Sequence, residues 1–156
     1  MTGRVLIDES TAAFAPSGNS IVLATRSSAL VPEVTRACAV RVLGGDRIVL
    51  LVPRATGGQT IANLRAASEA AVCISSPVDF RSVQVKGRTI AIADASRDDV
   101  MLAEEQLRAF ADNVARYGIT RQQARNLWMF DGWRVEIAVT SVYAQTPGPG
   151  AGARLA

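Results

Sequence analysis

The sequence contains no histidine, and this absence excludes several kinds of site. Catalytic triads with a histidine base, and zinc or haem sites with a histidine ligand, cannot be built by this chain alone. We expect no metal site. Only two cysteines are present, Cys38 and Cys73, and both lie within apolar segments. Two thiols do not form a disulfide framework, so we expect both to be buried as small apolar side chains.

Long apolar runs are also missing. Apolar runs such as residues 21–24 and 48–52 have the length of strands and not of a transmembrane helix. Asp8 and Glu9 precede any apolar segment, so the N-terminus does not resemble a secretion signal. We therefore expect a cytoplasmic protein that does not associate with membranes.

Lysine is almost absent: Lys86 is the only one, and arginine supplies the other basic residues. The formal net charge is +3, the arginines are spread along the chain, and only eight aromatic residues are available for base stacking. A nucleic-acid surface needs clustered basic residues, so no nucleic-acid partner is expected.

The pattern of apolar residues predicts a single α+β domain over residues 1–156, with irregular tails at 1–18 and 145–156. The length suits one hydrophobic core. Apolar runs bounded by turn residues predict about six strands, at 20–25, 34–43, 47–52, 70–75, 81–94 and 133–143. Helices are predicted from Gly57 to about 67, after Ser96 or Asp98, and after Thr120. Mainly antiparallel strands with peripheral helices suggest a small barrel or sandwich.

The segment 81–94 changes its alternation partway. Val83 and Val85 are apolar at odd positions, whereas Ile90 and Ile92 are apolar at even ones. Because side chains alternate strictly along a strand, we predict a bulge or bend near Gly87-Arg88.

Arg36 is the most informative single residue. In a continuous strand 34–43 it shares the apolar face with Val34 and Cys38, while Arg41 points to the opposite face. A guanidinium on an apolar face requires a carboxylate, a phosphate or solvent at the edge of the core. An internal ion pair, an edge position and phosphate binding all remain open.

Two further segments admit both a structural and a ligand-binding interpretation. Residues 57–60 are either a turn before a helix or an anion site at the helix N-terminus. Ser82, Gln84 and Lys86 lie on one face of their strand. That face is either solvated or a row of hydrogen-bonding groups for a heteroaromatic ring.

Four segments resemble, in the same order, the pyridoxamine 5'-phosphate oxidase-like flavin proteins. Residues 21–25 resemble the opening strand of that family, and Arg36 to Arg41 resembles the strand whose basic groups hold the phosphate of FMN. Asn63-Leu64-Arg65-Ala66, followed by Ala70-Ala71-Val72, is similar to the family's helix-to-strand turn. Residues 81–87 resemble the strand whose polar side chains approach the flavin.

The resemblance implies a split β-barrel that binds FMN as a homodimer and acts on a small molecule as an oxidoreductase. Carried onto this sequence, the FMN-binding residues are Thr25, Arg26, Arg36, Arg41, Pro53, Arg54, Gln59, Thr60, Ser82, Gln84 and Lys86. No side chain stands out as a catalytic acid or base. Two alternatives remain. One is a non-catalytic protein that binds a flavin or another phosphorylated ligand, and the other is a dimeric scaffold with a vestigial site.

The sequence also departs from the family pattern. Gly58, Gln59 and Thr60 occupy the places where the family often has Ser-x-Lys, so one charged contact to phosphate is missing. A contact of this kind contributes about 1.5–3 kcal/mol, and its loss lowers affinity roughly tenfold to a hundredfold. The C-terminal Arg-x-His element is absent, so pyridoxamine 5'-phosphate is not the expected substrate.

Overall fold

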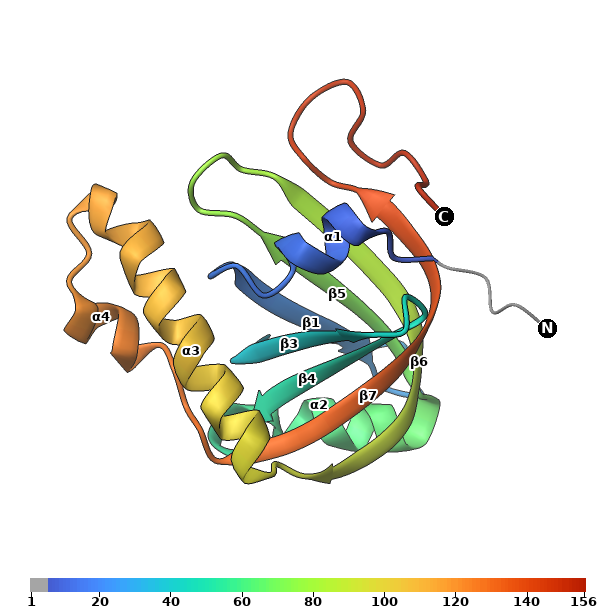
Figure 1. Ribbon diagram of the computed structural model, residues 1–156. Helices are drawn as coiled ribbons and strands as arrows, with labels where there is room; N and C mark the ends of the chain where they lie inside the picture. Colours follow the sequence, from blue (N-terminus) through green and yellow to red (C-terminus); the bar gives the residue numbers. More distant parts are fainter. Residues whose placement is uncertain (1–5) are drawn as a thin grey trace.

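The computed structural model describes residues 6–156 and shows an antiparallel sheet with helices at its periphery (Figure 1). In this part of the chain the sheet has seven strands in the order β2-β1-β5-β6-β7-β4-β3. The strands are β1 (Ser20–Arg26), β2 (Pro32–Ala37), β3 (Ala39–Leu43), β4 (Arg47–Pro53), β5 (Glu69–Ser75), β6 (Ser82–Asp94) and β7 (Gly132–Ala144). The helices are α1 (Glu9–Phe14), α2 (Arg54–Ala67), α3 (Arg97–Val114), a short 3₁₀ turn (Ala115–Tyr117) and α4 (Arg121–Asn126).

The sheet curls because its two edge strands, β2 and β3, follow one another in the chain with Cys38 between them. The prediction of one continuous strand over residues 34–43 is therefore wrong. The backbone N–H of Cys38 donates to the carbonyl of Leu51 on β4 at 2.8 Å, so the chain crosses from one side of the sheet to the other at this residue. The predicted α+β class and split-barrel architecture are confirmed.

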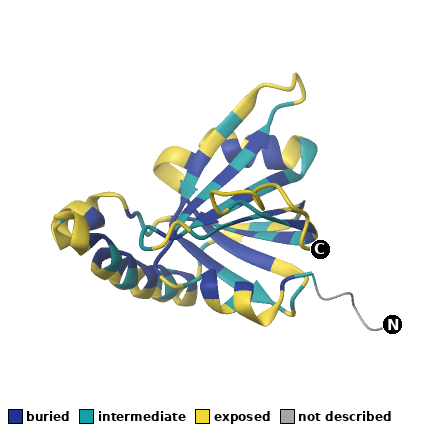
Figure 2. Cartoon of the chain, turned by 90° about the horizontal axis from the view of Figure 1, so that it is seen from above, coloured by how far each residue is buried: buried dark blue, intermediate teal, exposed yellow. Residues whose placement is uncertain are grey.

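Burial alternates along the strands, as Figure 2 shows. The inner face of the sheet forms the main core with residues of α1 and α2, whereas α3 and α4 form a second apolar cluster with Cys38, Ala39 and Leu51. In β1 only the inner face is buried, and the other face is half-exposed. Cys38 is buried as expected, whereas Cys73 is half-buried on the outer face of β5.

The predicted irregularity in β6 is confirmed by register shifts against β7 between Lys86 and Gly87 and between Thr89 and Ala91. Gly87 is required there, since a Cβ at this position would lie 2.2 Å from the carbonyl oxygen of Ala138. The bend lets the long β6 pass around the barrel.

The edge of β3 is closed by a side chain of α3. The amide of Gln106 accepts from the N–H of Val40 at 3.0 Å and donates to its carbonyl at 2.7 Å, in the way a neighbouring strand would. An edge strand with unpaired backbone N–H and C=O groups can pair with a strand of another molecule. Gln106 prevents this pairing at Val40 by occupying both of its backbone groups.

Helix boundaries follow their capping residues. The cap of α3 is Ser96, one of the two residues that the sequence offered, and it forms a capping box with Asp99. At α4 the predicted cap Thr120 forms a capping box with Gln123. Gly118 ends the helical segment with φ 77°, a left-handed conformation that favours glycine. The start of α2 was predicted wrongly: it begins at Arg54, immediately after β4, and not at Gly57.

The two ends of the domain also differ from expectation. Residues 1–5 of the predicted irregular N-terminal tail lie outside the described residues, and residues 9–14 form α1, capped by the Asp8 side chain. The C-terminal tail forms no helix or strand, yet it folds back on its own β7 through hydrogen bonds to Val142 and Ala144. Within residues 6–156, no helix is long and apolar enough to span a membrane.

Candidate functional site

Five residues, one from each of five adjacent strands, form a continuous row on the outer face of the sheet. Their pairing runs in the order Arg36 (β2), Val22 (β1), Cys73 (β5), Gln84 (β6) and Tyr143 (β7). Directly paired residues of antiparallel strands point to the same face, about 4.8 Å apart. We call this set the central row. It places an arginine at one end, an amide and a phenol toward the other, and small or apolar side chains between them.

Arg36 is the cation of the central row, and it lacks a counter-charge. Its Nε and Nη2 atoms are buried without a hydrogen-bond partner, and no carboxylate of residues 6–156 lies within salt-bridge distance. The guanidinium lies over two rings, 5.1 Å from the centre of Phe110 and 4.9 Å from that of Trp128. Desolvation by these neighbours lowers the pKa of Arg36. The group is held in place by aromatic faces and keeps unused donors.

The face predicted for Arg36 is wrong, for a reason found in the backbone. The buried residues of β2 are Thr35 and Ala37, while Val34 is 60% exposed, so Arg36 lies on the outer face and not on the core side. The break at Cys38 then shifts the alternation. As a result Arg41 is not turned away from Arg36: both arginines lie against α3, Arg41 in a groove beside Asp98.

The other predicted arginines already have partners. Arg26 forms an ion pair with Glu69. Arg54 donates to Asp94 at 2.8 Å and to Asp131 at 3.2 Å, and these two hydrogen bonds raise its pKa. Neither arginine is therefore free to neutralise a phosphate as Arg36 is.

Three predicted polar residues lie on α2 or against it: Thr25 and Thr60 are buried, whereas Gln59 is exposed. Asn63 links Gln59 to Thr25, because it accepts from the Gln59 amide at 2.9 Å and donates to the Thr25 hydroxyl at 3.1 Å. Thr60 is fully buried within α2, and its hydroxyl has no partner. Residues 57–60 are therefore neither a turn before a helix nor an anion site at a helix N-terminus, since they lie inside α2. Pro53 is buried at the position preceding α2.

The predicted polar face of β6 is confirmed. Ser82, Gln84 and Lys86 share the outer face with the same-face residues of β5. The Ser82 hydroxyl donates to Ser75 at 2.9 Å, Gln84 is half-buried in the central row, and Lys86 is exposed with its ammonium 5.0 Å from the centre of the Tyr143 ring.

A groove of about 440 Å³ opens beside the central row, on the same face of the sheet. It crosses β1, β5, β6 and β7 and is lined by Ala24, Thr25, Arg26, Glu69, Ala70, Ala71, Lys86, Gly87, Arg88 and Thr140. Its volume is in the range of small-molecule sites. Of the residues predicted for the flavin, Thr25, Arg26 and Lys86 contribute to it.

The structure adds residues that the sequence did not single out. Trp128 and Phe110 support Arg36, and Trp128 is itself fixed by donating its Nε1 hydrogen to the carbonyl of Cys38 at 2.7 Å. Phe110 lies in the helix predicted after Ser96 or Asp98, but nothing in the sequence indicated that it contacts Arg36. Tyr143 was expected only as the end of the last strand, and its place in the central row depends on the register of β7 against β6.

No protein-family model matches this sequence, and comparison with curated proteins finds no significant match. Similar solved structures do exist. HupZ of Group A Streptococcus has a TM-score of 0.60 at 13% identity, with 94% of this chain and all of that chain covered. A candidate pyridoxamine 5'-phosphate oxidase of Lactobacillus delbrueckii has a TM-score of 0.58 at 16% identity, covering 91% of this chain and 97% of that one. An FMN-binding protein of Syntrophomonas wolfei has a TM-score of 0.52 at 12% identity, with 88% and 87% covered.

These likenesses extend over nearly the whole chain. At 12–16% identity they concern the fold, and the resemblance to pyridoxamine 5'-phosphate oxidase-like proteins is confirmed at that level. The fold alone does not determine a ligand, because one fold hosts many functions. The case for a ligand therefore depends on Arg36 and the central row.

Proposed function

We propose that this chain binds flavin mononucleotide along the central row, with Arg36 as its phosphate ligand. The observation that supports this most is the unpaired guanidinium of Arg36, with Nε and Nη2 buried and without an acceptor. A desolvated cation without a counter-charge is costly. A phosphate supplies both the opposite charge and two acceptors in the geometry of a guanidinium.

The rest of the central row fits the flavin ring. Val22 and Cys73 present small, half-exposed side chains between Arg36 and Gln84. Three strand spacings, about 14 Å, separate Arg36 from Gln84. A ligand with an anionic group at one end and a flat heteroaromatic ring at the other matches that order. Gln84 has an amide that can both donate to and accept from such a ring.

The remaining predicted FMN contacts are assigned differently. Arg41 lies in a groove of α3 that is also lined by Asp98, Glu104 and Glu105, and these carboxylates offset its charge. Arg26 and Lys86 belong to the groove beside the central row. Thr25 and Thr60 are buried and support α2 and β1 instead. The missing family lysine is thus not replaced by Thr60, and Arg36 carries most of the phosphate affinity.

A bound flavin would supply hydride or single-electron transfer, so the protein would act as an oxidoreductase. The contribution of this chain is to hold the phosphate, to orient the ring against the sheet and to exclude water from one of its faces. Slow reduction of the bound flavin by nicotinamide nucleotides would instead favour a non-catalytic flavin-binding protein.

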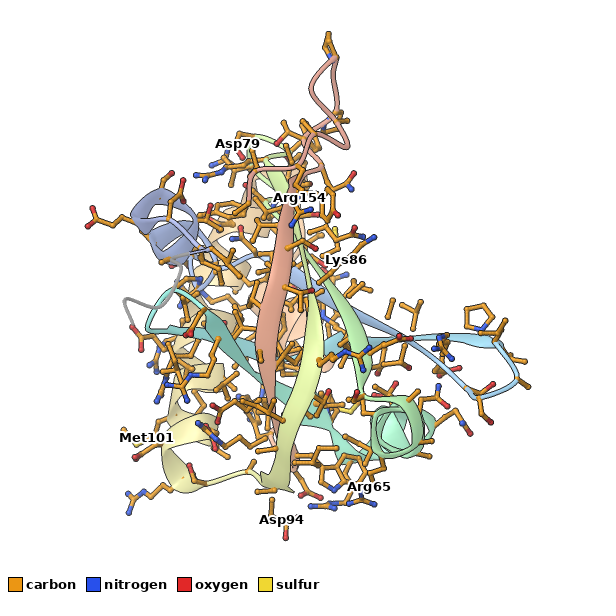
Figure 3. The ribbon with its side chains drawn as sticks, turned by 90° about the vertical axis from the view of Figure 1, so that its right-hand side faces the viewer. Arg65, Asp79, Lys86, Asp94, Met101 and Arg154 are labelled. Atoms are coloured by element: carbon orange, nitrogen blue, oxygen red, sulfur yellow. The ribbon has the colours of Figure 1, made fainter. Side chains whose placement is uncertain are left out.

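We also propose that two copies associate through the β1–β2 hairpin. This hairpin projects from the body of the domain (Figure 3) and exposes Leu30 by 70%, Val31 by 61% and Val34 by 60%. Val34 pairs with Ala24 on the outer face, so the apolar hairpin is continuous with the face that carries the central row. A second copy seated there would cover these side chains and shield the flavin from solvent.

Absorbance after FMN is added and excess removed tests the flavin proposal. The unmodified protein should retain the flavin bands, and Arg36→Gln should lose them while its circular dichroism remains that of a folded protein. Arg108→Gln is the matched control, since it removes an exposed arginine of α3 outside the central row. A colourless unmodified protein, or an Arg36→Gln variant that retains FMN equally well, would overturn the proposal.

A further inference from the structure

The groove beside the central row has a floor of small residues and a rim of charged ones. Ala24 of β1 pairs with Ala71 of β5, and these two alanines form part of the floor. Ala71 also pairs with Lys86 of β6, which belongs to the rim. Figure 3 shows Lys86 on the side of β6 toward the projecting hairpin. Alanine side chains leave space above the sheet that larger residues would fill, and the groove results from that choice of residues.

The rim carries more positive than negative charge. Arg26, Lys86 and Arg88 supply three positive charges, and Glu69 supplies the one negative charge of the lining, which leaves two positive charges. Glu69 is shared: Arg26 forms an ion pair with it, and Arg88 lies 3.7 Å from its other oxygen. Lys86 has no salt-bridge partner among residues 6–156, and its ammonium lies over the face of the Tyr143 ring.

We infer that this groove is a second ligand site, which takes an organic molecule with two negative charges, such as a phosphomonoester or a dicarboxylate. Its volume of about 440 Å³ admits a small organic molecule but not a macromolecule. The alanines accept the apolar part of the ligand, while Lys86 and Arg88 neutralise its anionic group.

The position of the groove gives this ligand a role. Lys86 follows Gln84 by two residues on the same face of β6, about 7 Å along the strand. A molecule in the groove therefore lies beside the end of the central row that we assign to the flavin ring. The interpretation of this ligand as the substrate rests on the proposed flavin function. The binding of the ligand to the groove does not depend on that function.

Phenyl phosphate is a suitable probe, because it combines an apolar ring with a doubly charged phosphate. We would titrate it into the full-length protein at low ionic strength and follow the backbone amide resonances of Ala71 and Gly87. These resonances should shift with saturation, and neutral benzyl alcohol should shift them much less. Arg88→Gln should weaken the affinity roughly fivefold to tenfold. Arg97→Gln, which removes an exposed arginine of α3 outside the groove, should leave it unchanged.

The outcome separates this inference from the flavin proposal. Unshifted groove amides, or equal affinities in Arg88→Gln and Arg97→Gln, would overturn the inference even if the protein retains FMN. Saturable phenyl phosphate binding that Arg88→Gln weakens would support it even if the protein ignores FMN, in which case only the flavin proposal fails.

Discussion

The guanidinium of Arg36 lies over the ring of Trp128, with its central carbon 4.9 Å from the ring centre. The same indole donates a hydrogen bond to the Cys38 carbonyl, at the point where β2 passes into β3. Trp128 therefore fixes the backbone at the strand break and also supports the side chain of Arg36. In this way Trp128 links the stability of the fold to the proposed binding of FMN.

Replacement of Trp128 should affect both properties. We expect Trp128→Leu to lower the free energy of unfolding by about 2–4 kcal/mol, since a buried aromatic ring and a hydrogen bond to a buried carbonyl are lost. FMN affinity should fall as well, because Arg36 loses its support. Trp128→Phe retains an aromatic face and should retain most of the FMN affinity. Denaturant titration and FMN titration measure the two effects. A Trp128→Leu variant with unchanged FMN affinity would contradict the supporting role.

The reactivity of the two cysteines toward a thiol reagent tests where the flavin binds. Cys73 is half-buried in the central row, whereas Cys38 is buried, and that burial raises the pKa of its thiol. A thiol reagent should therefore modify Cys73 in the native protein and reach Cys38 only after denaturation. Saturating FMN should slow the reaction of Cys73 severalfold, as mass spectrometry of the alkylated protein would show. Equal rates with and without FMN would place the flavin elsewhere.

Leu30 lies in the hairpin that we propose as the dimer contact, and its backbone is in a left-handed conformation. This exposed leucine has φ 63°, a left-handed conformation that costs a residue with a side chain about 1–2 kcal/mol. Leu30→Gly relieves that strain, so the isolated domain should unfold at the same or a slightly higher denaturant concentration. The proposed dimer of Leu30→Gly should dissociate at a higher protein concentration than the unmodified dimer, because the apolar contact of the Leu30 side chain is lost.

Light scattering over a dilution series measures the association, and Leu127→Ala is the control at an exposed leucine outside the hairpin. Two results would refute the role of the hairpin. One is a protein that stays monomeric at all concentrations, and the other is a dimer that Leu30→Gly leaves intact.

Asp99 makes the stability of α3 dependent on pH. Burial raises the pKa of Asp99, but hydrogen bonds from Ser96 and Arg134 outweigh this effect and the pKa lies below its ordinary value. A carboxyl with a lowered pKa in the folded state stabilises the protein above its unfolded value, near 4, and loses that contribution as the pH falls through the folded value.

Asp99→Asn should therefore cost about 1–2 kcal/mol at pH 7, and the difference from the unmodified protein should shrink below pH 4. Denaturant titrations at several pH values measure this difference. A difference that stays constant down to pH 2 would show that the charge of Asp99 does not contribute.

Much of the fold could be predicted from the sequence, because local chemistry determines it. Ser96 or Asp98, and Thr120, indicated two of the helix starts to within two residues, and the change of alternation in 81–94 indicated the bulge at Gly87. Helix α1 was missed because six residues give too little periodicity, although Asp8 is a recognisable cap.

The errors at the site have a different cause. The side on which Arg36 and Arg41 lie depends on a break at Cys38 that Trp128 stabilises from 90 residues away. No local pattern contains that contact. The order Arg36–Val22–Cys73–Gln84–Tyr143 likewise follows from strand order and register, which are set by packing of the whole sheet.

A comparison of FMN with riboflavin shows whether Arg36 binds the phosphate of FMN. Riboflavin has the same ring but no phosphate, so calorimetric titration of both ligands into the unmodified protein and Arg36→Gln isolates the phosphate contact. We predict that the unmodified protein prefers FMN by about tenfold to a hundredfold, and that Arg36→Gln reduces this preference to nearly one. A preference that is the same in both proteins would contradict the account.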